Sequence, residues 1–461
     1  MKLTIWGAAK QVTGSMHLLE AGDYRILIDC GLDYERDTFQ EENQYFPFNP
    51  ASIDVVILTH AHIDHSGNLP TLLRMGFNGQ ILCTPPTADL TELLLMDSVN
   101  IFLSKQQKRS RGKRSGSGPK PLYLHKHVMD TVERFVTIGF NKIFQIRQGI
   151  NLQFIPVGHL LGAAAVVLEI EEQGVTKKIA FTGDIGRKDY PVLTDPQPLP
   201  AVDYLVTEST YGGRLHSKDT TITAKLKDII EETCVKFPGR LIIPAFSIGR
   251  TQALVFTLNK LFSSGALPPV KIFVDSPLAE FATDVYRKHH QLLNDEAQDF
   301  YRRSGDEFEF DSLSYVQDKR ESISISNYHE PCIIISSAGM LEGGRIQDHL
   351  YHNIQNYYCT ILFIGYCAKG TLGHRLLRGD SIVRLRHRDL SVYATIKKTD
   401  LLSGHGDHDD LMGNVTSQDP HQLKKVFLVH GEDSSLSSLA SAIEAAGYTA
   451  VIAEKGEVYT L

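Results

Sequence analysis

The chain contains 461 residues, of which 42% are hydrophobic and 22% charged, and its 47 Lys and Arg against 54 Asp and Glu give a net charge of −7. This length is enough for two sizeable hydrophobic cores, and the composition is that of an ordinary globular protein. The mild acidity does not suggest a histone-like nucleic-acid binder, although a local basic groove remains compatible with it.

Three features of the sequence bear on its compartment. No apolar run reaches the roughly 18 residues of a membrane-spanning helix. The first residues lack the long apolar core of a signal peptide, and the six cysteines show no C-x-x-C spacing. We therefore expect a cytoplasmic protein with buried, reduced thiols and no contact with a membrane.

The chain begins with short strands separated by glycine turns. We predict strands over 2–6, 16–20 and 24–28, and the third of these ends at Asp29, just before Gly31. A carboxylate at a strand end is commonly directed into a site, although turn capping is an equally ordinary role. Asp29 is thus a candidate site residue that needs support from elsewhere in the chain.

The strongest motif of the sequence follows the next predicted strand, Val55-Val56-Ile57-Leu58. The run Thr59-His60-Ala61-His62-Ile63-Asp64-His65 places three histidines and a carboxylate within six positions at the mouth of a buried strand. Such a concentration of imidazoles can converge on one cation, and the Asp-His pair indicates a second position beside it. The motif predicts a metal centre, and a helix near 66–75 should follow it.

A basic stretch comes after a strand at 80–83 and a helix that begins behind Pro85-Pro86. Residues 105–114 read Lys-Gln-Gln-Lys-Arg-Ser-Arg-Gly-Lys-Arg and are the most basic stretch of the chain. We expect a mobile loop here, which is either plain solvated surface or a contact for a polyanion.

Further polar candidates lie at the ends of later strands. We predict strands over 151–157, 163–170 and 177–182; His159 follows the first of these and Asp184 the third, while Glu208 follows the apolar segment 203–207. Several polar groups that each follow a strand suggest that these strand ends meet at one edge of a sheet sandwich.

From about residue 217 helices and strands alternate, which favours a parallel α/β domain. We predict helices at 219–236, 249–264 and 277–292 and strands at 240–243, 271–274 and 332–336. Small polar groups in its turns could bind phosphate oxygens through hydroxyls, a guanidinium and helix N-termini, although helix capping is the default explanation. These phosphate candidates are Ser247, Arg250, Ser336 and Ser337.

The last part of the sequence returns to strands, predicted near 360–365, 381–384 and 391–396, with a final strand near 450–453. Two histidines stand out: His405 in Ser-Gly-His-Gly-Asp before a helix, and His430 in Val-His-Gly-Glu at a strand end.

Together these motifs predict a dinuclear metal centre. The chain offers more nitrogen and oxygen donors than one tetrahedral zinc can use, and carboxylate can bridge two cations where imidazole cannot. We predict two Zn²⁺ ions, with Mn²⁺ as an alternative, bridged by Asp184. The expected ligands are His60, His62, Asp64, His65, His159, Asp184 and His430.

Three further residues receive catalytic roles in this interpretation. A bridging hydroxide would be the nucleophile, and Asp29 would hold it by a hydrogen bond. His405, paired with Glu208, would protonate the leaving oxygen as general acid.

With these residues assembled, the chain resembles the metallo-β-lactamase superfamily and, within it, the β-CASP nucleases. Asp29, the His60–His65 run, His159 and Asp184 match the superfamily motifs, while Glu208, His405 and His430 match the β-CASP motifs A, B and C. The resemblance implies an α/β fold, an αββα sandwich with an inserted α/β β-CASP domain. The expected domains are 1–207 and 371–461 for the two parts of the sandwich and 208–370 for the insertion.

The resemblance also implies a function. Histidine at motif C is typical of the members that act on RNA, and the layout is similar to compact prokaryotic relatives of the pre-mRNA 3′-end cleavage nuclease. We expect a zinc-dependent ribonuclease that cleaves single-stranded RNA endonucleolytically, with a homodimer plausible by family analogy. The alternatives are a 5′-exoribonuclease, a thioester or lactam hydrolase, and a catalytically silent RNA-binding paralogue.

Overall fold

The computed structural model describes residues 1–34, 43–112, 121–217 and 221–461, with the backbone alone described for 105–112. These residues form two compact units. The first unit consists of Met1–Lys188, Thr194–Leu215 and His405–Leu461, and the second of Asp189–Leu193 and His216–Gly404. The predicted domain boundaries at 207/208 and 370/371 therefore differ from the limits of the two units. Strand β19 (Thr395–Lys398) pairs with β16 (Cys359–Phe363), which ties the segment before residue 404 to the second unit.

The first unit is built on two seven-stranded sheets among the described residues. One sheet has the order β22 (Val458–Thr460), β1 (Lys2–Gly7), β2 (Met16–Ala21), β3 (Tyr24–Ile28), β4 (Val55–Ile57), β5 (Gln80–Cys83) and β6 (Phe135–Thr137). The other has the order β21 (Ala450–Ile452), β20 (Lys425–Leu428), β11 (Tyr204–Thr207), β10 (Val175–Phe181), β9 (Ala164–Glu172), β8 (Ile150–Pro156) and β7 (Ile143–Arg147).

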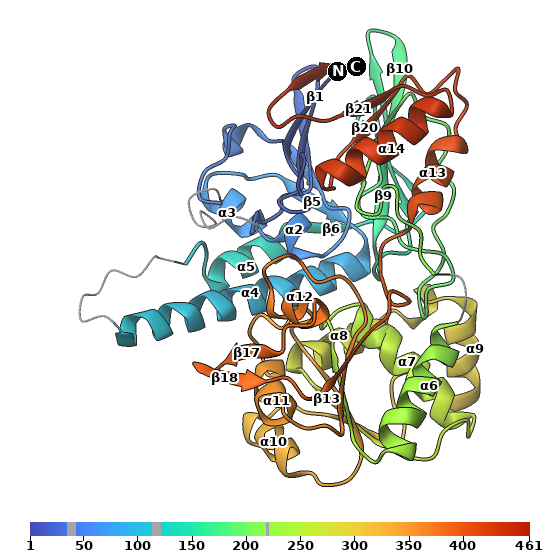
Figure 1. The fold of residues 1–461 in the computed structure, drawn as a ribbon. Coiled ribbons are helices and arrows are strands. Elements are labelled where there is room, and N and C mark those ends of the chain that lie inside the picture. Colours follow the sequence, from blue (N-terminus) through green and yellow to red (C-terminus); the bar gives the residue numbers. More distant parts are fainter. Residues whose placement is uncertain (35–42, 113–120, 218–220) are drawn as a thin grey trace. The chain divides into compact units, whose positions relative to one another are not determined.

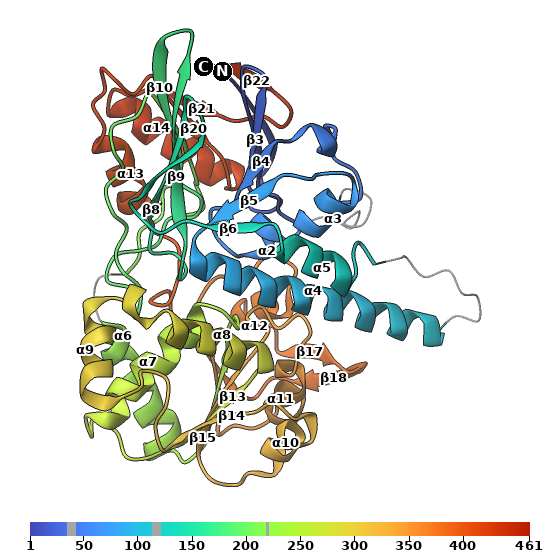
Figure 2. The same ribbon diagram turned by 180° about the vertical axis from the view of Figure 1, so that it is seen from behind.

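The two sheets pack face to face around one core, to which Ile5 and Ile28 contribute from one sheet and Phe154 and Phe181 from the other. Helices cover both outer faces, so the unit is the expected αββα sandwich (Figures 1 and 2). The covering elements are α3 (Leu69–Arg74), α4 (Pro85–Gly112) and α5 (His125–Val132) on one side and α13 (His408–Thr416) and α14 (Asp433–Ala445) on the other, with the short turns η1 (Pro50–Ser52) and α2 (Ile63–Ser66).

Two local predictions need correction. Residues 105–112 continue helix α4 instead of forming a loop, because no proline or turn sequence interrupts the helix before Gly112. The strand near 450–453 is not the last one: β22 follows it and pairs with β1, which brings both chain ends onto one sheet edge (Figure 1). The side chains of 105–112 and all of residues 113 and 114 lie outside the described residues, so the polyanion contact predicted for them stays a prediction.

The second unit confirms the predicted parallel α/β arrangement. Its main sheet has the order β14 (Leu313–Tyr315), β13 (Lys271–Asp275), β15 (Cys332–Ser336), β12 (Arg240–Pro244), β16 and β19, with every pairing parallel. A separate hairpin joins β17 (Ile382–Leu385) to β18 (Arg388–Ser391). The helical elements are α6 (Ile222–Ile230), the π-helical turn η2 (Glu231–Lys236), α7 (Arg250–Ser263), α8 (Pro277–Lys288), η3 (His290–Leu292), α9 (Asp295–Ser304), α10 (Lys319–Ser324), η4 (Ile325–Asn327), α11 (Ile346–Asn353) and α12 (Leu372–Leu377).

The strand directions explain where the polar motifs meet. In the first unit β3 and β4 run parallel, as do β10, β11 and β20. The carboxyl ends of these strands therefore share one edge of the sandwich, and within three residues of the strand ends come Asp29, His60, Asp184, Glu208 and His430. Residues that are far apart in the sequence thus become spatial neighbours at this edge, because each follows the end of one of these strands.

Candidate metal centre

The backbone holds the His60–His65 loop in a fixed shape. After β4 the chain turns into the single helical turn α2, which starts behind His62 and contains Asp64 and His65. The loop after β3 supports this turn, since Cys30 N donates to His65 O at 2.7 Å. A Cβ on Gly31 would lie 1.6 Å from Asp64 O, so only glycine permits this approach.

A first group of side chains gathers around His62. Its Nδ1 lies 3.1 Å from His60 Nε2 and 3.1 Å from His159 Nε2. Asp184 Oδ2 is 3.7 Å from His60 Nε2 and 3.6 Å from His159 Nε2. The ligand atoms of His60, His62, His159 and Asp184 all lie within 4.8 Å of one another, close enough to share one cation.

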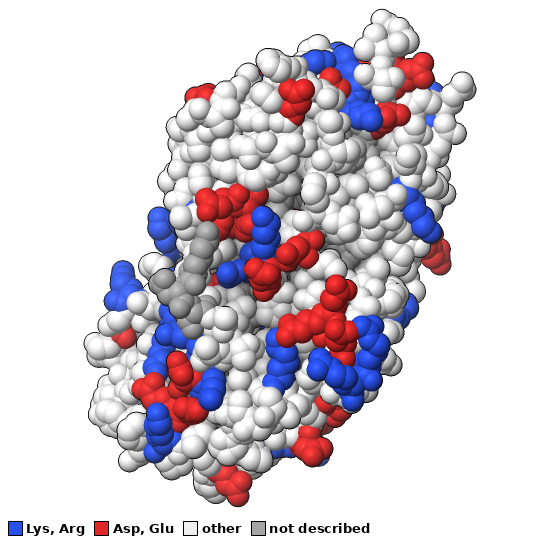
Figure 3. Space-filling view, turned by 90° about the vertical axis from the view of Figure 1, so that its right-hand side faces the viewer, with Lys and Arg blue, Asp and Glu red and all other residues white. Residues whose placement is uncertain are grey.

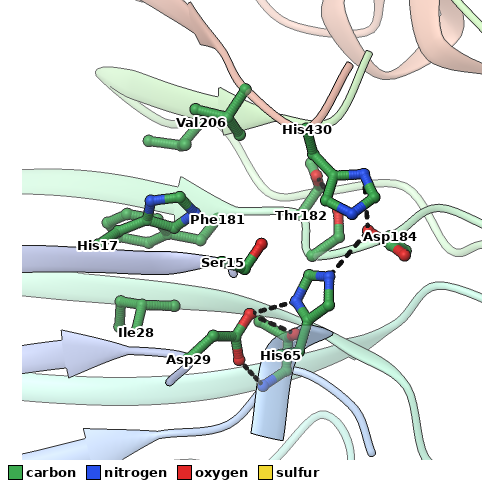
Figure 4. Close-up of a pocket in the computed structure, with 13 residues that line it drawn as sticks. Ser15, His17, Ile28, Asp29, His65, Phe181, Thr182, Asp184, Val206 and His430 are labelled. Atoms are coloured by element: carbon green, nitrogen blue, oxygen red, sulfur yellow. Dashed lines mark hydrogen bonds and ion pairs between the residues drawn. The ribbon is translucent and has the colours of Figure 1, made fainter. Parts of the chain in front are cut away.

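A second group lies on the other side of Asp184. It comprises Asp64, His65 and His430, again with ligand atoms within 4.8 Å. His65 Nε2 is 3.3 Å from Asp184 Oδ1, and His430 Nε2 is 3.6 Å from Asp64 Oδ2. One oxygen of Asp184 therefore faces each group, and Figure 4 shows its carboxylate next to His65 and His430.

The chemistry of these groups fits a divalent metal. His65 Nε2, His430 Nε2 and Asp184 Oδ1 are buried and have no hydrogen-bond partner among the described residues. Buried polar atoms are normally paired, and converging imidazole and carboxylate donors that are not paired are typical of a metal site. The cluster can thus bind metal.

The pKa values of the histidines divide between the two groups. Burial and the nearby His65 hold the pKa of His60 well below its ordinary value, and burial lowers the pKa of His62 to about 4, so both imidazoles are neutral and ready to bind a metal. Burial acts in the same direction on His65 and His430, but nearby carboxylates together outweigh it: Asp184 and Asp29 raise the pKa of His65, and Asp184 and Asp64 raise the pKa of His430 to about 9. The Asp184 carboxylate thus favours positive charge at this position, and a bound cation would supply that positive charge in place of the protons.

Asp29 is held by hydrogen bonds to Thr59 and His65. Its Oδ1 accepts from Thr59 N at 2.8 Å, and its Oδ2 accepts from Thr59 Oγ1 at 2.8 Å and from His65 Nδ1 at 2.7 Å. These bonds use both oxygens, and the side chain is buried below the cluster (Figure 4). In this structure the carboxylate orients His65 through its contact with Nδ1. The hydrogen bond from Asp29 to a bridging hydroxide stays a prediction.

Two threonines that the sequence did not single out complete this support. Thr59 Oγ1 lies 3.1 Å from His60 Nδ1, and Thr210 Oγ1 lies 3.1 Å from His430 Nδ1. Since Thr59 donates its proton to Asp29 and Thr210 can donate to His430 O at 3.2 Å, both can accept from Nδ1–H and direct Nε2 into the cluster. The sequence did contain a signal for both threonines: Thr59 directly precedes His60, and Thr210 comes two residues after Glu208.

Glu208 and His405 meet as predicted from the sequence. His405 Nδ1 lies 3.2 Å from both carboxylate oxygens of Glu208, and the Ile185 amide also donates to Glu208. A short β-bridge between Gly186 and His405 fixes the backbone of the histidine. Burial would lower the pKa of His405, but Glu208 and Asp184 outweigh it and raise that pKa. His405 Nδ1 is 4.0 Å from Asp184 Oδ2, so the pair borders the metal groups.

The predicted phosphate residues of the second unit are only partly brought together. Ser247 Oγ and Ser337 Oγ lie 3.0 and 3.3 Å from Ser276 Oγ, so three hydroxyls cluster at the carboxyl end of the parallel sheet. Ser336 is buried and donates to Asp275 O at 3.0 Å, which gives it a structural role. Arg250 lies 4.9 Å over the Phe246 ring. Ser276 was missed, although it lies only two residues after the predicted strand 271–274.

Matches to known protein families and relatives cover nearly the whole chain. Residues 10–226 match the metallo-beta-lactamase superfamily model, residues 251–376 the Beta-Casp domain and residues 389–453 the Zn-dependent metallo-hydrolase RNA specificity domain. Ribonuclease TTHA0252 of Thermus thermophilus is 29% identical over 458 residues, 99% of both chains. Transcription termination factor FttA of Methanosarcina mazei is 29% identical over 96% of this chain and 69% of its own length.

A solved structure supports the fold alone. A protein of unknown function from Enterococcus faecalis V583 matches with a TM-score of 0.55 and 12% identity, over 100% of this chain and 99% of that one. No helix in the described part of the chain is long and apolar enough to cross a bilayer. The three domain matches in sequence order, the sandwich fold and the His/Asp cluster agree: the chain belongs to the metallo-β-lactamase superfamily and, within it, to the β-CASP family.

Proposed function

We propose that this protein is a metal-dependent ribonuclease that hydrolyses phosphodiester bonds of single-stranded RNA, with endonucleolytic cleavage. One observation carries the proposal: Asp184 lies between two groups of side chains that could each hold a metal ion, and the Glu208–His405 pair lies beside the same carboxylate. The names of the relatives, a ribonuclease and a transcription termination factor, support RNA as the substrate, as does the match to an RNA specificity domain.

The two groups would hold two Zn²⁺ ions, with Mn²⁺ as the alternative. His60, His62 and His159 would bind one ion, and Asp64, His65 and His430 the other, while Asp184 would offer one oxygen to each. The nitrogen-rich first group suits zinc, and the second group contains the additional carboxylate that manganese accepts. When bound, the ions would supply Lewis acidity toward water and toward a phosphoryl oxygen.

The chain's own residues would orient and protonate the substrate. Glu208 holds His405 by its Nδ1, and His405 would deliver a proton to the leaving ribose oxygen. Thr59, Asp29 and Thr210 keep the imidazoles in one tautomer, so the ligand geometry is set before substrate binds. In the second unit, the hydroxyls of Ser247, Ser276 and Ser337 would bind a phosphate of the RNA.

The test is cleavage of a single-stranded RNA by the purified protein after chelation and after return of Zn²⁺ or Mn²⁺. We expect activity only with metal, and His65→Ala should lower it at least about 100-fold, since a ligand is lost. The surface variant Arg302→Gln, on the exposed side of α9, is the matched control and should cleave normally. Persistent cleavage by His65→Ala would contradict the proposal, as would thioesterase activity above nuclease activity.

Cleavage polarity and assembly need separate measurements. A time course on one RNA labelled at its 5′ or its 3′ end should give internal fragments with both labels, whereas immediate release of a 5′-labelled mononucleotide would favour a 5′-exoribonuclease. Light scattering on a size-exclusion column should give twice the mass of 51.4 kDa if the expected homodimer forms. A protein that binds RNA but contains no zinc as purified, and does not cut RNA after Zn²⁺ or Mn²⁺ is added, would be a silent paralogue.

A further inference from the structure

A basic segment whose side chains the structure describes lies in the second unit and is not used by the proposed catalytic site. Between Tyr366 and Lys398 the sequence contains eight Lys or Arg and two Asp, a net charge of +6 in a chain whose total is −7. This segment forms helix α12, the β17–β18 hairpin and strand β19. On the face shown in Figure 3, by contrast, Lys and Arg mostly lie next to Asp and Glu.

The hairpin is a rigid support for three arginines. Val383 and Leu385 are buried in the core of the second unit, so the alternation of the strand exposes Arg384. The chain reverses at Arg386 and His387, whose φ angles of 46° and 64° are those of a tight two-residue hairpin turn. The arginines are therefore carried on a short, well-defined ribbon.

Helix α11 holds two of these arginines in place. The Arg386 guanidinium lies 4.9 Å over the Tyr351 ring and pairs with Asp348, and 47% of its side chain is exposed. Arg388 Nη1 donates to Tyr351 Oη at 3.0 Å. A guanidinium that is already oriented loses less conformational entropy when it binds a phosphate oxygen.

A pair of exposed tyrosines lies at the base of the same hairpin. The rings of Tyr357 and Tyr393 are stacked with centroids 4.8 Å apart and an interplanar angle of 7°, and 72% and 43% of these residues are exposed. Tyr393 N donates to Ile354 O, and the preceding residue, Val392, donates to Ser381 O at the foot of β17. Large exposed aromatic residues of this kind mark binding sites.

We propose that this basic hairpin surface, formed by Arg384, Arg386, Arg388, Tyr357 and Tyr393, binds single-stranded RNA. The arginines bind backbone phosphates, and a base stacks on the tyrosine pair. Cations next to exposed aromatic rings are the combination that single strands require, because bases supply ring faces and the backbone supplies negative charge. This assignment rests on the proposed ribonuclease function and adds a second RNA contact to it.

The first experiment measures the charge contribution. Binding of a fluorescent 20-nucleotide oligouridylate is followed by anisotropy in EDTA, which prevents cleavage, over a series of KCl concentrations. The variant Arg384→Gln/Arg386→Gln/Arg388→Gln should bind about tenfold more weakly at 100 mM salt, and its salt slope should be less negative by about 2. The control Lys225→Gln/Arg302→Gln/Arg303→Gln removes the same charge elsewhere in the second unit and should bind like wild type.

The second experiment measures stacking. Tyr357→Leu/Tyr393→Leu should weaken binding about tenfold without a change in salt slope, since no charge is lost. Tyr301→Leu on α9 removes a comparably exposed ring and should have no effect. Equal RNA affinity of the wild type and both hairpin-surface variants would overturn the assignment, and circular-dichroism melting curves identify any variant that fails to fold.

Failure of this inference is distinguishable from failure of the proposed function. If wild-type protein binds and cleaves RNA with metal but the hairpin-surface variants bind equally well, only the hairpin surface is wrong. If wild-type protein neither binds RNA nor hydrolyses bis(p-nitrophenyl) phosphate with metal, the ribonuclease proposal itself fails.

Discussion

Two buried aspartates at strand ends show how differently the same residue can be used in the two units. Asp275, at the end of β13, accepts from Arg345 and His349 at 2.6 Å each, and Ser322 donates to it at 2.6 Å. Asp184, after β10, faces four histidine nitrogens at 3.3 to 3.7 Å, and its Oδ1 has no hydrogen-bond partner among the described residues. Asp275 is satisfied by protein, whereas Asp184 is not.

The difference separates a structural network from a ligand-binding one. Hydrogen bonds to the charged form hold the pKa of Asp275 below its ordinary value against the opposing effect of burial. Ser336, the last residue of β15, donates to the backbone carbonyl of the same aspartate. A buried carboxylate without close donors costs free energy until a cation binds it. An imidazole next to a buried aspartate therefore does not indicate a metal site by itself. A buried carboxylate oxygen without a hydrogen-bond partner, such as Asp184 Oδ1, does.

The largest expected effect concerns Asp184. A saturating metal at about 1,000 times its Kd would stabilise the wild-type protein by about 4 kcal/mol. Asp184→Asn should lose most of this increase, because a neutral amide cannot replace the shared charge. Thermal unfolding with chelator and with Zn²⁺ measures the increase. Asp275→Asn, the matched control, should keep it, and an undiminished zinc effect in Asp184→Asn would remove the basis of the comparison.

Asp275→Asn should instead lower stability with and without metal. The substitution leaves Arg345 and His349 beside a neutral group in a buried network, and we expect a loss of about 3 kcal/mol in the free energy of unfolding. Guanidinium titration followed by circular dichroism measures it. Asp284→Asn breaks the exposed pair with Arg287 and should cost less than about 1 kcal/mol. Equal losses in both variants would show that the Asp275 network is no more than surface pairing.

The smallest effect is expected at His17, which stacks on Phe181 and lines the cavity below the metal groups (Figure 4). Burial, with the charges of His65 and His430, lowers the pKa of His17 to about 3. Between pH 3 and 6.5 the unfolded chain binds a proton there that the folded chain does not, so acidification destabilises the fold.

His17→Phe removes this titration. The loss of stability between pH 7.5 and 5.5 should be smaller than in wild type by about 1 kcal/mol, as measured by denaturant unfolding of metal-free protein at both pH values. His387→Gln, at an exposed hairpin tip, should leave the pH dependence unchanged. An identical pH dependence in His17→Phe would show that the folded protein tolerates a charged imidazole at His17, contrary to its lowered pKa.

Local sequence determined a large part of this protein. The buried strand 55–57 followed by His60–His65 identified the metal motif, because a strand end and a short turn are set by neighbouring residues. The other donors could also be found, since each follows an apolar strand. The change to alternating helices and strands likewise predicted the parallel sheet of the second unit, which the pairing of β12 to β16 confirms.

Tertiary structure alone decided which of these groups lie around one carboxylate, which are joined by a hydrogen bond, and which do not meet. Asp29 and Asp184 both follow strands in the sequence. Asp29 is hydrogen-bonded to Thr59 and His65, whereas Asp184 lies between two histidine groups and its Oδ1 has no hydrogen-bond partner among the described residues. Ser336 and Ser337 are adjacent, yet the alternation of an extended chain buries one hydroxyl and turns the other toward Ser276. Such outcomes depend on strand register and on side chains up to hundreds of residues away, so no local pattern of the sequence contains them.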